Sequence, residues 1–214
     1  MTSVIEEVIY AAALLTWVII LVKVITRKIY EHYIRKGMDK NVIIYYNRKI
    51  IHLLAGGVVT VLTPFLFNEP FIVFIFAIAL ALFSYLPYLK GRLNYWYQIS
   101  ENMFDIHFCL VWGLVMLLSR LIMKDWWIGV LPLLFMSIGD AVTGIVRNMI
   151  FRKRTKSWWG NLAMLLACVP IGSFLGIKGI ISAFIASIIE RYEYKWIDDN
   201  ITVPLISFFI LSVF

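Results

Sequence analysis

Long apolar runs separated by short polar segments make up most of the 214-residue chain. As helices, runs of about 18 or more residues are long enough to cross the roughly 30 Å of hydrocarbon in a membrane. The pattern predicts eight spanning helices, at residues 5–26, 50–67, 71–89, 105–123, 126–149, 160–177, 179–194 and 201–214. We therefore expect one all-α integral membrane domain over residues 1–214, a polytopic membrane helical bundle.

The boundary between the sixth and seventh runs decides the number of spans. Only Gly176-Ile177-Lys178-Gly179 separates the two runs. A lysine in mid-membrane costs about 3 kcal/mol on insertion scales, and the flanking glycines suit a tight turn. We therefore expect two helices here, while a seven-span alternative would merge the two runs into one.

Basic residues are distributed unevenly over this map. Of the 20 Lys and Arg residues, 17 fall in four alternate connections, at residues 23–49, 90–104, 147–159 and 190–200. The first of these is expected to be the end of helix one followed by an extramembrane stretch. Because basic loops stay in the cytoplasm, both termini are predicted to lie on the opposite, outer side. The membrane is expected to be the cell membrane or the endoplasmic reticulum membrane. We therefore attribute the net charge of +7 to the orientation of the chain in the membrane and to attraction between basic residues and anionic lipid head groups. We expect no nucleic acid partner.

A first polar cluster lies at the mouth of the second predicted helix, in Arg48-Lys49-Ile50-Ile51-His52. Arg48 and His52 are four residues apart and therefore share a helix face. Two fixed cations beside an imidazole can bind an anion such as a phosphate. The alternative is that the cations only set the topology and that a neighbouring carbonyl satisfies His52.

An acidic residue late in the fifth predicted helix, Asp140, is a second indication of function. It belongs to Gly139-Asp140-Ala141-Val142-Thr143-Gly144 and follows a long apolar run. Ionisable residues in spanning segments are costly and usually line a functional cavity. Asp140 can hold Mg²⁺ together with phosphate oxygens, and the two glycines let backbone or ligand come close. The alternative is an ion pair between Asp140 and Arg147.

A basic segment, Arg152-Lys153-Arg154-Thr155-Lys156-Ser157, precedes the sixth predicted helix. We expect Ser157 to cap that helix, whose free N–H groups and positive dipole favour phosphate. Taken alone, the segment is typical of a cytoplasmic basic loop. Directly after Asp140, it predicts a pocket for a metal ion and a polyphosphate.

Acidic residues gather close to the C-terminus, on the predicted positive side: Glu190 and Asp198-Asp199-Asn200. They can hold a metal ion or accept a proton from a substrate hydroxyl. The alternative is that they balance the charge of the basic loops. His107 has no comparable context and is expected to be a packing residue.

Together, these motifs resemble the polyprenol kinase family, which includes dolichol kinase, phytol kinase and a CTP-dependent diacylglycerol kinase and is related to the phosphatidate cytidylyltransferases. The resemblance covers residues 48–205 and rests on the order and spacing of Arg48-Lys49-x-x-His52, Gly139-Asp140-Ala141-x-x-Gly144, Lys156-Ser157-x-x-Gly160-x-x-Ala163, Glu190 and Asp199-Asn200-x-x-x-Pro204-Leu205. It implies a membrane kinase that uses Mg²⁺ and transfers phosphate from CTP to a lipid alcohol, a polyprenol such as dolichol or alternatively diacylglycerol.

The resemblance also implies roles for individual residues. Asp140 would hold the metal and would form the catalytic set with Glu190 and Asp199. The nucleotide and its phosphates would be bound by Arg48, Lys49, His52, Gly144, Lys153, Lys156, Ser157, Gly160 and Asn200. Near the C-terminus the chain has no Lys-Arg pair followed by a Lys-Asp pair, which the bacterial cytidylyltransferases carry, and this favours a kinase over the alternative of a CDP-lipid synthase. A transporter, the other alternative, would place charged residues through the depth of the membrane.

Overall fold

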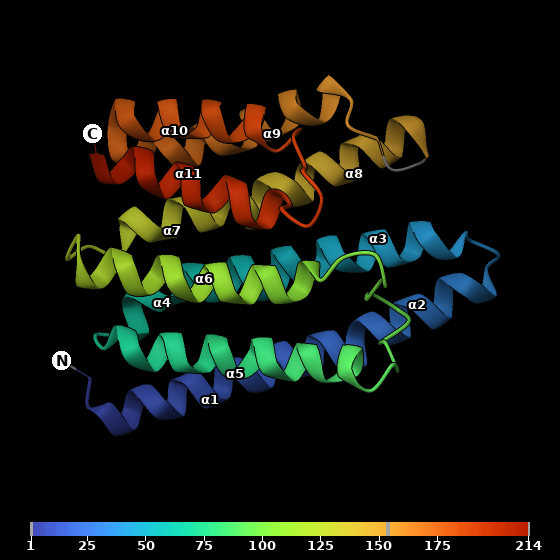
Figure 1. Ribbon diagram of the computed structural model, residues 1–214, viewed down its shortest axis with the longest axis horizontal. Helices are drawn as coiled ribbons and strands as arrows, with labels where there is room; N and C mark the ends of the chain where they lie inside the picture. Colours follow the sequence, from blue (N-terminus) through green and yellow to red (C-terminus); the bar gives the residue numbers. More distant parts are fainter. Residues whose placement is uncertain (1, 153–154, 214) are drawn as a thin grey trace.

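Helices pack side by side along a common direction to form the molecule (Figure 1). The computed structural model describes residues 2–152 and 155–213; it is 80% helical, and no strand occurs in these ranges. Six continuous helical segments within them are long and apolar enough to cross a membrane: Val4–Arg35, Lys40–Leu66, Pro70–Leu89, Phe104–Leu121, Trp127–Phe151 and Trp158–Ile189. The shorter apolar helix α11 (Asp199–Val213) follows them. The prediction of an all-α polytopic membrane bundle is confirmed.

The first two segments are longer than their apolar cores. One runs through α1 (Val4–Ile20), the π-helix η1 (Leu21–Ile25) and α2 (Thr26–Arg35); the next runs through α3 (Lys40–Ile51), the π-helix η2 (His52–Gly57) and α4 (Val58–Leu66). The predicted end of the first helix at residue 26 and the predicted start of the second at residue 50 were therefore wrong, because the first continues to Arg35 and the second begins at Lys40. Lys and Arg are good helix formers, and Asp39 caps α3 by accepting hydrogen bonds from two backbone N–H groups.

The next three segments begin and end within two residues of the predicted bounds. They are α5 (Pro70–Leu89), α6 (Phe104–Leu121) and a composite of α7 (Trp127–Leu134), the π-helix η3 (Phe135–Gly139) and α8 (Asp140–Phe151). Pro70 is the first residue of α5, where its fixed φ suits a helix and its missing N–H costs nothing. The apolar pattern thus located these helices well.

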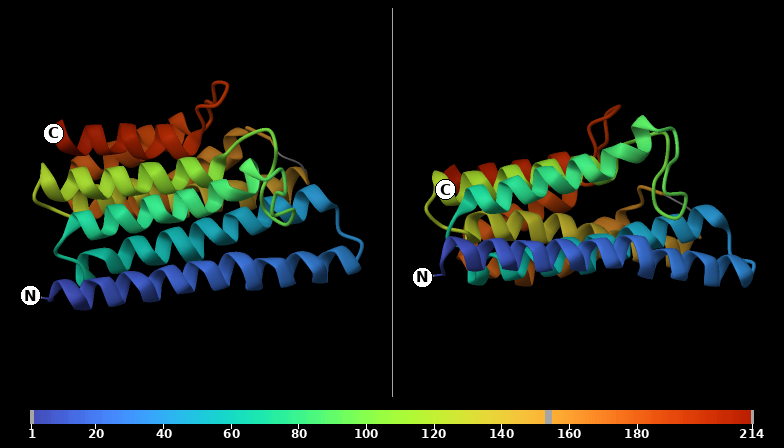
Figure 2. Two further views of the ribbon diagram at one scale, coloured as in Figure 1. Left: turned by 60° about the horizontal axis from the view of Figure 1, so that its bottom comes forward. Right: turned by 90° about the horizontal axis from the view of Figure 1, so that it is seen from below.

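The last long segment folds back on itself. Helix α9 (Trp158–Gly172) is followed by a short 3₁₀ turn, η4 (Ser173–Leu175), and by α10 (Gly176–Ile189), which lies beside α9 (Figure 1). Gly176 has a φ of +67°, which glycine adopts at little cost. Both chain ends therefore lie at the same end of the bundle (Figure 1 and Figure 2). The alternative in which the sixth and seventh runs form one straight span is wrong.

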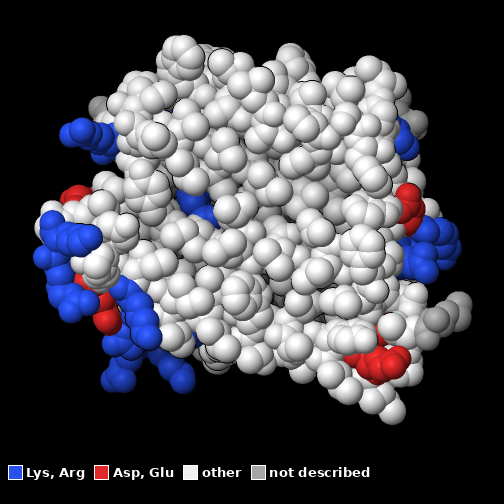
Figure 3. Space-filling view, turned by 180° about the vertical axis from the view of Figure 1, so that it is seen from behind, with Lys and Arg blue, Asp and Glu red and all other residues white. Residues whose placement is uncertain are grey.

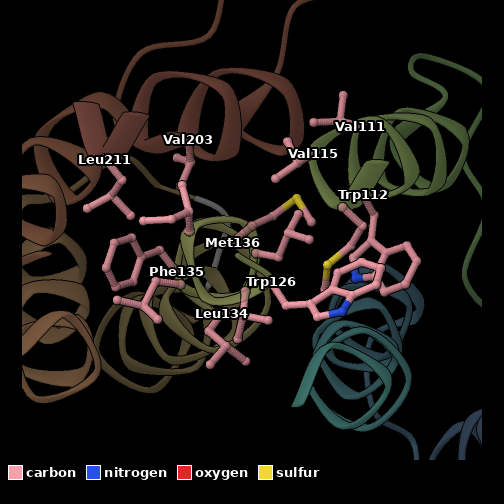
Figure 4. Packing of buried hydrophobic residues seen from close by; sticks show 14 of the residues in the cluster. Val111, Trp112, Val115, Trp126, Leu134, Phe135, Met136, Val203 and Leu211 are labelled. Carbon is pink, nitrogen blue, oxygen red and sulfur yellow. The ribbon is translucent and has the colours of Figure 1, made fainter. Parts of the chain in front are cut away.

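The α7–η3 rod forms the centre of the bundle. Phe135 and Met136 of η3 pack in one cluster with Val203 of α11 and Val115 of α6 (Figure 4). These side chains are at most 1% exposed, so the middle of the bundle is closely packed. Asp140 directly follows this rod, and the packing around the rod fixes its position.

Charged side chains are scarce in the middle of the face that Figure 3 shows. A broad area between the two ends of the bundle carries almost no exposed charge there, and Lys and Arg gather most densely at one end. That end carries α2 and the turn leading to α3, opposite the two termini. This area is the surface expected to face lipid, and the basic end is the one toward which α8 extends.

Candidate active site

Two π-helical segments bring the site together. Segments η2 and η3 contact each other because Gly56 and Gly57 present no side chains between them. A Cβ on Gly56 would overlap the ring of Phe108 and lie 2.9 Å from Ser137 Oγ. His52 is the first residue of η2, and Asp140 directly follows η3. Such π-helical insertions are frequent at functional sites, and here they place an imidazole beside a carboxylate.

Asp140 is held by the cluster that lies 88–92 residues earlier in the chain. Lys49 Nζ lies 2.6 Å from both carboxylate oxygens of Asp140. His52 Nδ1 lies 3.0 Å from Asp140 Oδ2, out of line for a hydrogen bond. All three side chains are at most 6% exposed. The predicted topology placed these two motifs at the same membrane face, and the structure brings them into contact, whereas the alternative pair between Asp140 and Arg147 does not form.

Arg147 instead forms a buried ion pair with Glu190. The guanidinium donates two parallel hydrogen bonds, Nη1 to Glu190 Oε1 (2.7 Å) and Nη2 to Glu190 Oε2 (2.8 Å). Nη2 also donates to Asn161 Oδ1 (2.9 Å), and Nε donates to the carbonyl of Ser157 (3.1 Å). Bidentate charge-assisted pairs are among the strongest hydrogen-bonded contacts in proteins. This pair joins α8, α9 and α10 at the basic end of the bundle.

Gly160 makes room for this arginine. A methyl group there would overlap Nε of Arg147, so we expect Gly160→Ala to destabilise the protein by about 1–3 kcal/mol by overpacking, although alanine is the better helix former. Gly57→Ala is the matched control, since its new Cβ would meet nothing closer than 3.8 Å. Thermal unfolding in detergent measures both, and equal midpoints for the two variants would contradict the prediction.

Lys156 connects the acidic residues that follow α10. Its Nζ donates to the carbonyl of Glu190 (2.8 Å) and contacts Glu193 Oε1 (2.9 Å) and Asp199 Oδ2 (3.3 Å). Burial lowers the pKa of Lys156, but the neighbouring carboxylates, Asp199 foremost, outweigh burial and raise this pKa above its ordinary value. Lys156 is therefore a cation at neutral pH. These contacts agree with the interpretation that the acidic residues near the C-terminus balance the charge of basic side chains.

Three carboxylates converge in this network and fit a divalent cation. One oxygen each of Asp140, Glu190 and Asp199 lies within 4.8 Å of the others. The adjoining space has a volume of about 20 Å³, enough for roughly one water-sized species, and carboxylate oxygens are the ligands that Mg²⁺ prefers. Basic side chains now contact these oxygens, so a bound metal would take over part of their role.

Other predicted site residues have different surroundings. A methyl on Gly144 would overlap Lys49, so the absence of a side chain at Gly144 makes room for the side chain of Lys49. Ser157 does occupy the N-cap position of α9, but its hydroxyl makes no capping hydrogen bond, and that expectation was wrong. Asn200 Nδ2 donates to the Phe104 carbonyl (3.4 Å), and Asn200 does not line the small pocket. Lys153 lies outside the described residues.

Several residues of the site were not predicted to be functional. Tyr45 and Glu193 line the pocket, and Asn161 binds Arg147. A signal for Arg147 was present, because residues 140, 144 and 147 fall on one face of a helix. His107 was expected to be a packing residue with a satisfied side chain, and its Nδ1 lies 2.8 Å from Asp198 Oδ2, a contact that joins α6 to the segment before α11. The identity of this partner was not predicted. Such a pairing across 91 residues leaves no local pattern in the sequence.

The small pocket lined by the three carboxylates and their basic partners is called the charged pocket below. A second cavity, apolar and larger, lies beside it. It has a volume of about 140 Å³, is partly open to its surroundings, and runs between α1, η2, α4, α5 and α6. Arg48 and Phe104 line both this cavity and the charged pocket. The guanidinium of Arg48 lies over the Phe104 ring, 3.8 Å from its centroid. The two side chains form part of the wall between an apolar space and a charged one.

We compared the chain with models of protein families, with curated proteins and with solved structures, and none of them matches it.

Proposed function

We propose that the chain is a membrane-bound lipid kinase, which transfers the terminal phosphate of a nucleoside triphosphate to the hydroxyl of a long-chain alcohol. The observation that carries the proposal is the shared wall of Arg48 and Phe104 between an apolar cavity and a charged pocket. A reaction between a lipid and a polyphosphate needs such a boundary, because one reactant is hydrophobic and the other is highly charged.

The charged pocket suits phosphoryl transfer. That reaction depends on positioning and on neutralising the charge of the phosphates, and the protein itself does little covalent chemistry. Lys49, Arg147 and Lys156 supply cations that would turn toward the phosphates. Mg²⁺, held by Asp140 with Glu190, would supply further charge neutralisation when bound. Each of these carboxylates now contacts a basic side chain, so the site is charge-balanced before a ligand enters.

Asp199 is our choice for the proton acceptor in this reaction. Both oxygens of Asp140 and of Glu190 contact cationic side chains at 2.6–2.8 Å, whereas Asp199 meets Lys156 at 3.3 Å. The lipid oxygen would form a bond to the γ-phosphorus while the bond to the β-phosphate oxygen breaks. The hydroxyl proton would pass to the carboxylate of Asp199, and the products would be a nucleoside diphosphate and a lipid phosphate.

The donor and the sidedness of the reaction come from other observations. CTP as the donor, and a polyprenol such as dolichol as the acceptor, rest on the resemblance to the polyprenol kinases. The cytoplasmic location of the site rests on the positive-inside rule, because the site lies toward the basic end of the bundle. Nucleotides are available on that side of the membrane.

A product assay tests the proposal. Purified protein in detergent would receive Mg²⁺, a mixed pool of prenols and diacylglycerol, and CTP or ATP labelled at the γ-phosphate. We expect label to move into a lipid with CTP and not with ATP. Label released as pyrophosphate would instead establish a CDP-lipid synthase. If no lipid caused either nucleotide to be consumed, the enzyme proposal would be abandoned in favour of transport.

A further inference from the structure

The apolar cavity is long and slender. Its wall on α5 extends from Val73 to Tyr88, fifteen residues and therefore roughly 22 Å at 1.5 Å per residue. Its volume of about 140 Å³ is spread over that length. An apolar cavity of similar volume, roughly 150 Å³, is filled by a single benzene molecule. The part of the cavity enclosed by protein therefore has room for one hydrocarbon segment and not for two segments side by side.

One end of this cavity is polar and incompletely hydrogen-bonded. Asp105 accepts hydrogen bonds from Gln98 Nε2 (2.7 Å) and Tyr88 Oη (3.1 Å), so these groups are satisfied. Asn102 Oδ1 and His52 Nδ1 also belong to the cavity lining, but both atoms are buried without a hydrogen-bond partner among the described residues. Buried polar atoms are rarely left so, because an unmade hydrogen bond is costly.

A hydroxyl group matches these two atoms. It is a donor and an acceptor at once, so it can donate to the amide oxygen of Asn102 or exchange a hydrogen bond with the imidazole of His52. His52 also lies 3.0 Å from Asp140. A hydroxyl at this end would be at the edge of the charged pocket, while the rest of the molecule extends between α1 and α5. A molecule with an apolar chain and one terminal hydroxyl satisfies both features.

We infer that this cavity is the binding site for the hydroxyl-bearing end of a single-chain lipid alcohol, and that it discriminates against diacylglycerol. The inference rests on the proposed function for the role of the hydroxyl as phosphate acceptor. The first part of the chain lies within the protein, and the remainder leaves through the open side into the bilayer. Diacylglycerol carries two acyl chains next to its hydroxyl, and the slender cavity has no room for the second.

Photolabelling tests the inference without any phosphate transfer. A long-chain alcohol with a diazirine near its hydroxyl would be added to the wild-type protein in detergent, and labelled peptides would be mapped. We expect label on cavity-lining residues of α1 and α5. A saturating single-chain alcohol should abolish the label, whereas diacylglycerol should compete at least about tenfold more weakly, a difference of roughly 1.4 kcal/mol.

Two variants on one helix sharpen the test. Leu80 lines the cavity, so Leu80→Trp should fill it and reduce labelling about tenfold or more. Leu82→Trp is the matched control, because Leu82 is 60% exposed and should label as the wild type does. Asn102→Leu should remove the preference for the alcohol over its methyl ether. Diacylglycerol competing as well as the alcohol, or equal labelling of the two tryptophan variants, would overturn the inference.

These experiments distinguish failure of the proposed lipid site from failure of the proposed kinase activity. Alcohol labelling that Leu80→Trp abolishes, without phosphate transfer by the wild type, would keep the lipid site and remove the kinase. Phosphate transfer that Leu80→Trp leaves intact would keep the kinase and overturn this site.

Discussion

Asp140→Asn should reduce phosphate transfer to the lipid by about a hundredfold or more, equivalent to roughly 3 kcal/mol of lost transition-state stabilisation. The substitution removes the charge that holds Lys49 and His52 in place and that, in the proposed function, would attract a metal ion, while it preserves the shape of the side chain. Initial rates of label transfer from γ-labelled nucleotide measure the effect. If the proposed metal site is right, added Mn²⁺ should restore little, because the lost carboxylate would itself be a ligand.

Asp39→Asn is the matched control for this prediction. Asp39 is exposed and caps α3, and asparagine caps a helix about as well as aspartate. Its rate should therefore equal that of the wild type. An Asp140→Asn protein with near-normal turnover would remove Asp140 from the metal site and leave it only as the partner of Lys49.

Glu190→Gln should destabilise the protein by about 3–5 kcal/mol. Arg147 is 2% exposed and Glu190 is 1% exposed, so the variant leaves a guanidinium buried without its counter-charge, which is the costly way to break a buried ion pair. Denaturant titration in mixed micelles measures the free energy of unfolding. Phosphate transfer should fall with stability, because Arg147 would lose its orientation.

The chain offers a matched control on its surface. Arg27 and Glu31 form an ion pair of similar length, 2.9 Å, with side chains about half exposed. Glu31→Gln should change the free energy of unfolding by no more than about 0.5 kcal/mol. Equal losses from the two Glu→Gln variants would contradict the argument that burial makes the Arg147–Glu190 pair matter.

A double variant separates the pair's structural and chemical roles. Replacing both partners by apolar residues, as in Arg147→Met with Glu190→Leu, should recover most of the stability lost in Glu190→Gln, because no unpaired charge remains. Phosphate transfer should stay low, since a cation and a carboxylate of the charged pocket are gone. Recovery of both properties would show that the pair is structural only.

The apolar pattern by itself determined the class of fold. Every predicted span corresponds to a helix, because a membrane requires long apolar runs whose backbone hydrogen bonds are made internally. The errors of the prediction from the apolar pattern concern helix ends that consist of polar residues. Helix α2 and the first turns of α3 lie beyond the apolar runs and were missed. There, helix propensity and capping by Asp39 decide the structure, and the hydrophobic pattern has no information on either.

The sequence also indicated which motifs carry charge at one membrane face, and the structure brings most of them together. Only the tertiary structure decided the partners. It paired Asp140 with Lys49, Arg147 with Glu190, and His107 with Asp198. These choices depend on the close approach of η2 to η3 at Gly56 and on the room that Gly160 leaves for Arg147. Such contacts join residues 43 to 91 positions apart, and helix periodicity relates only residues within a few turns.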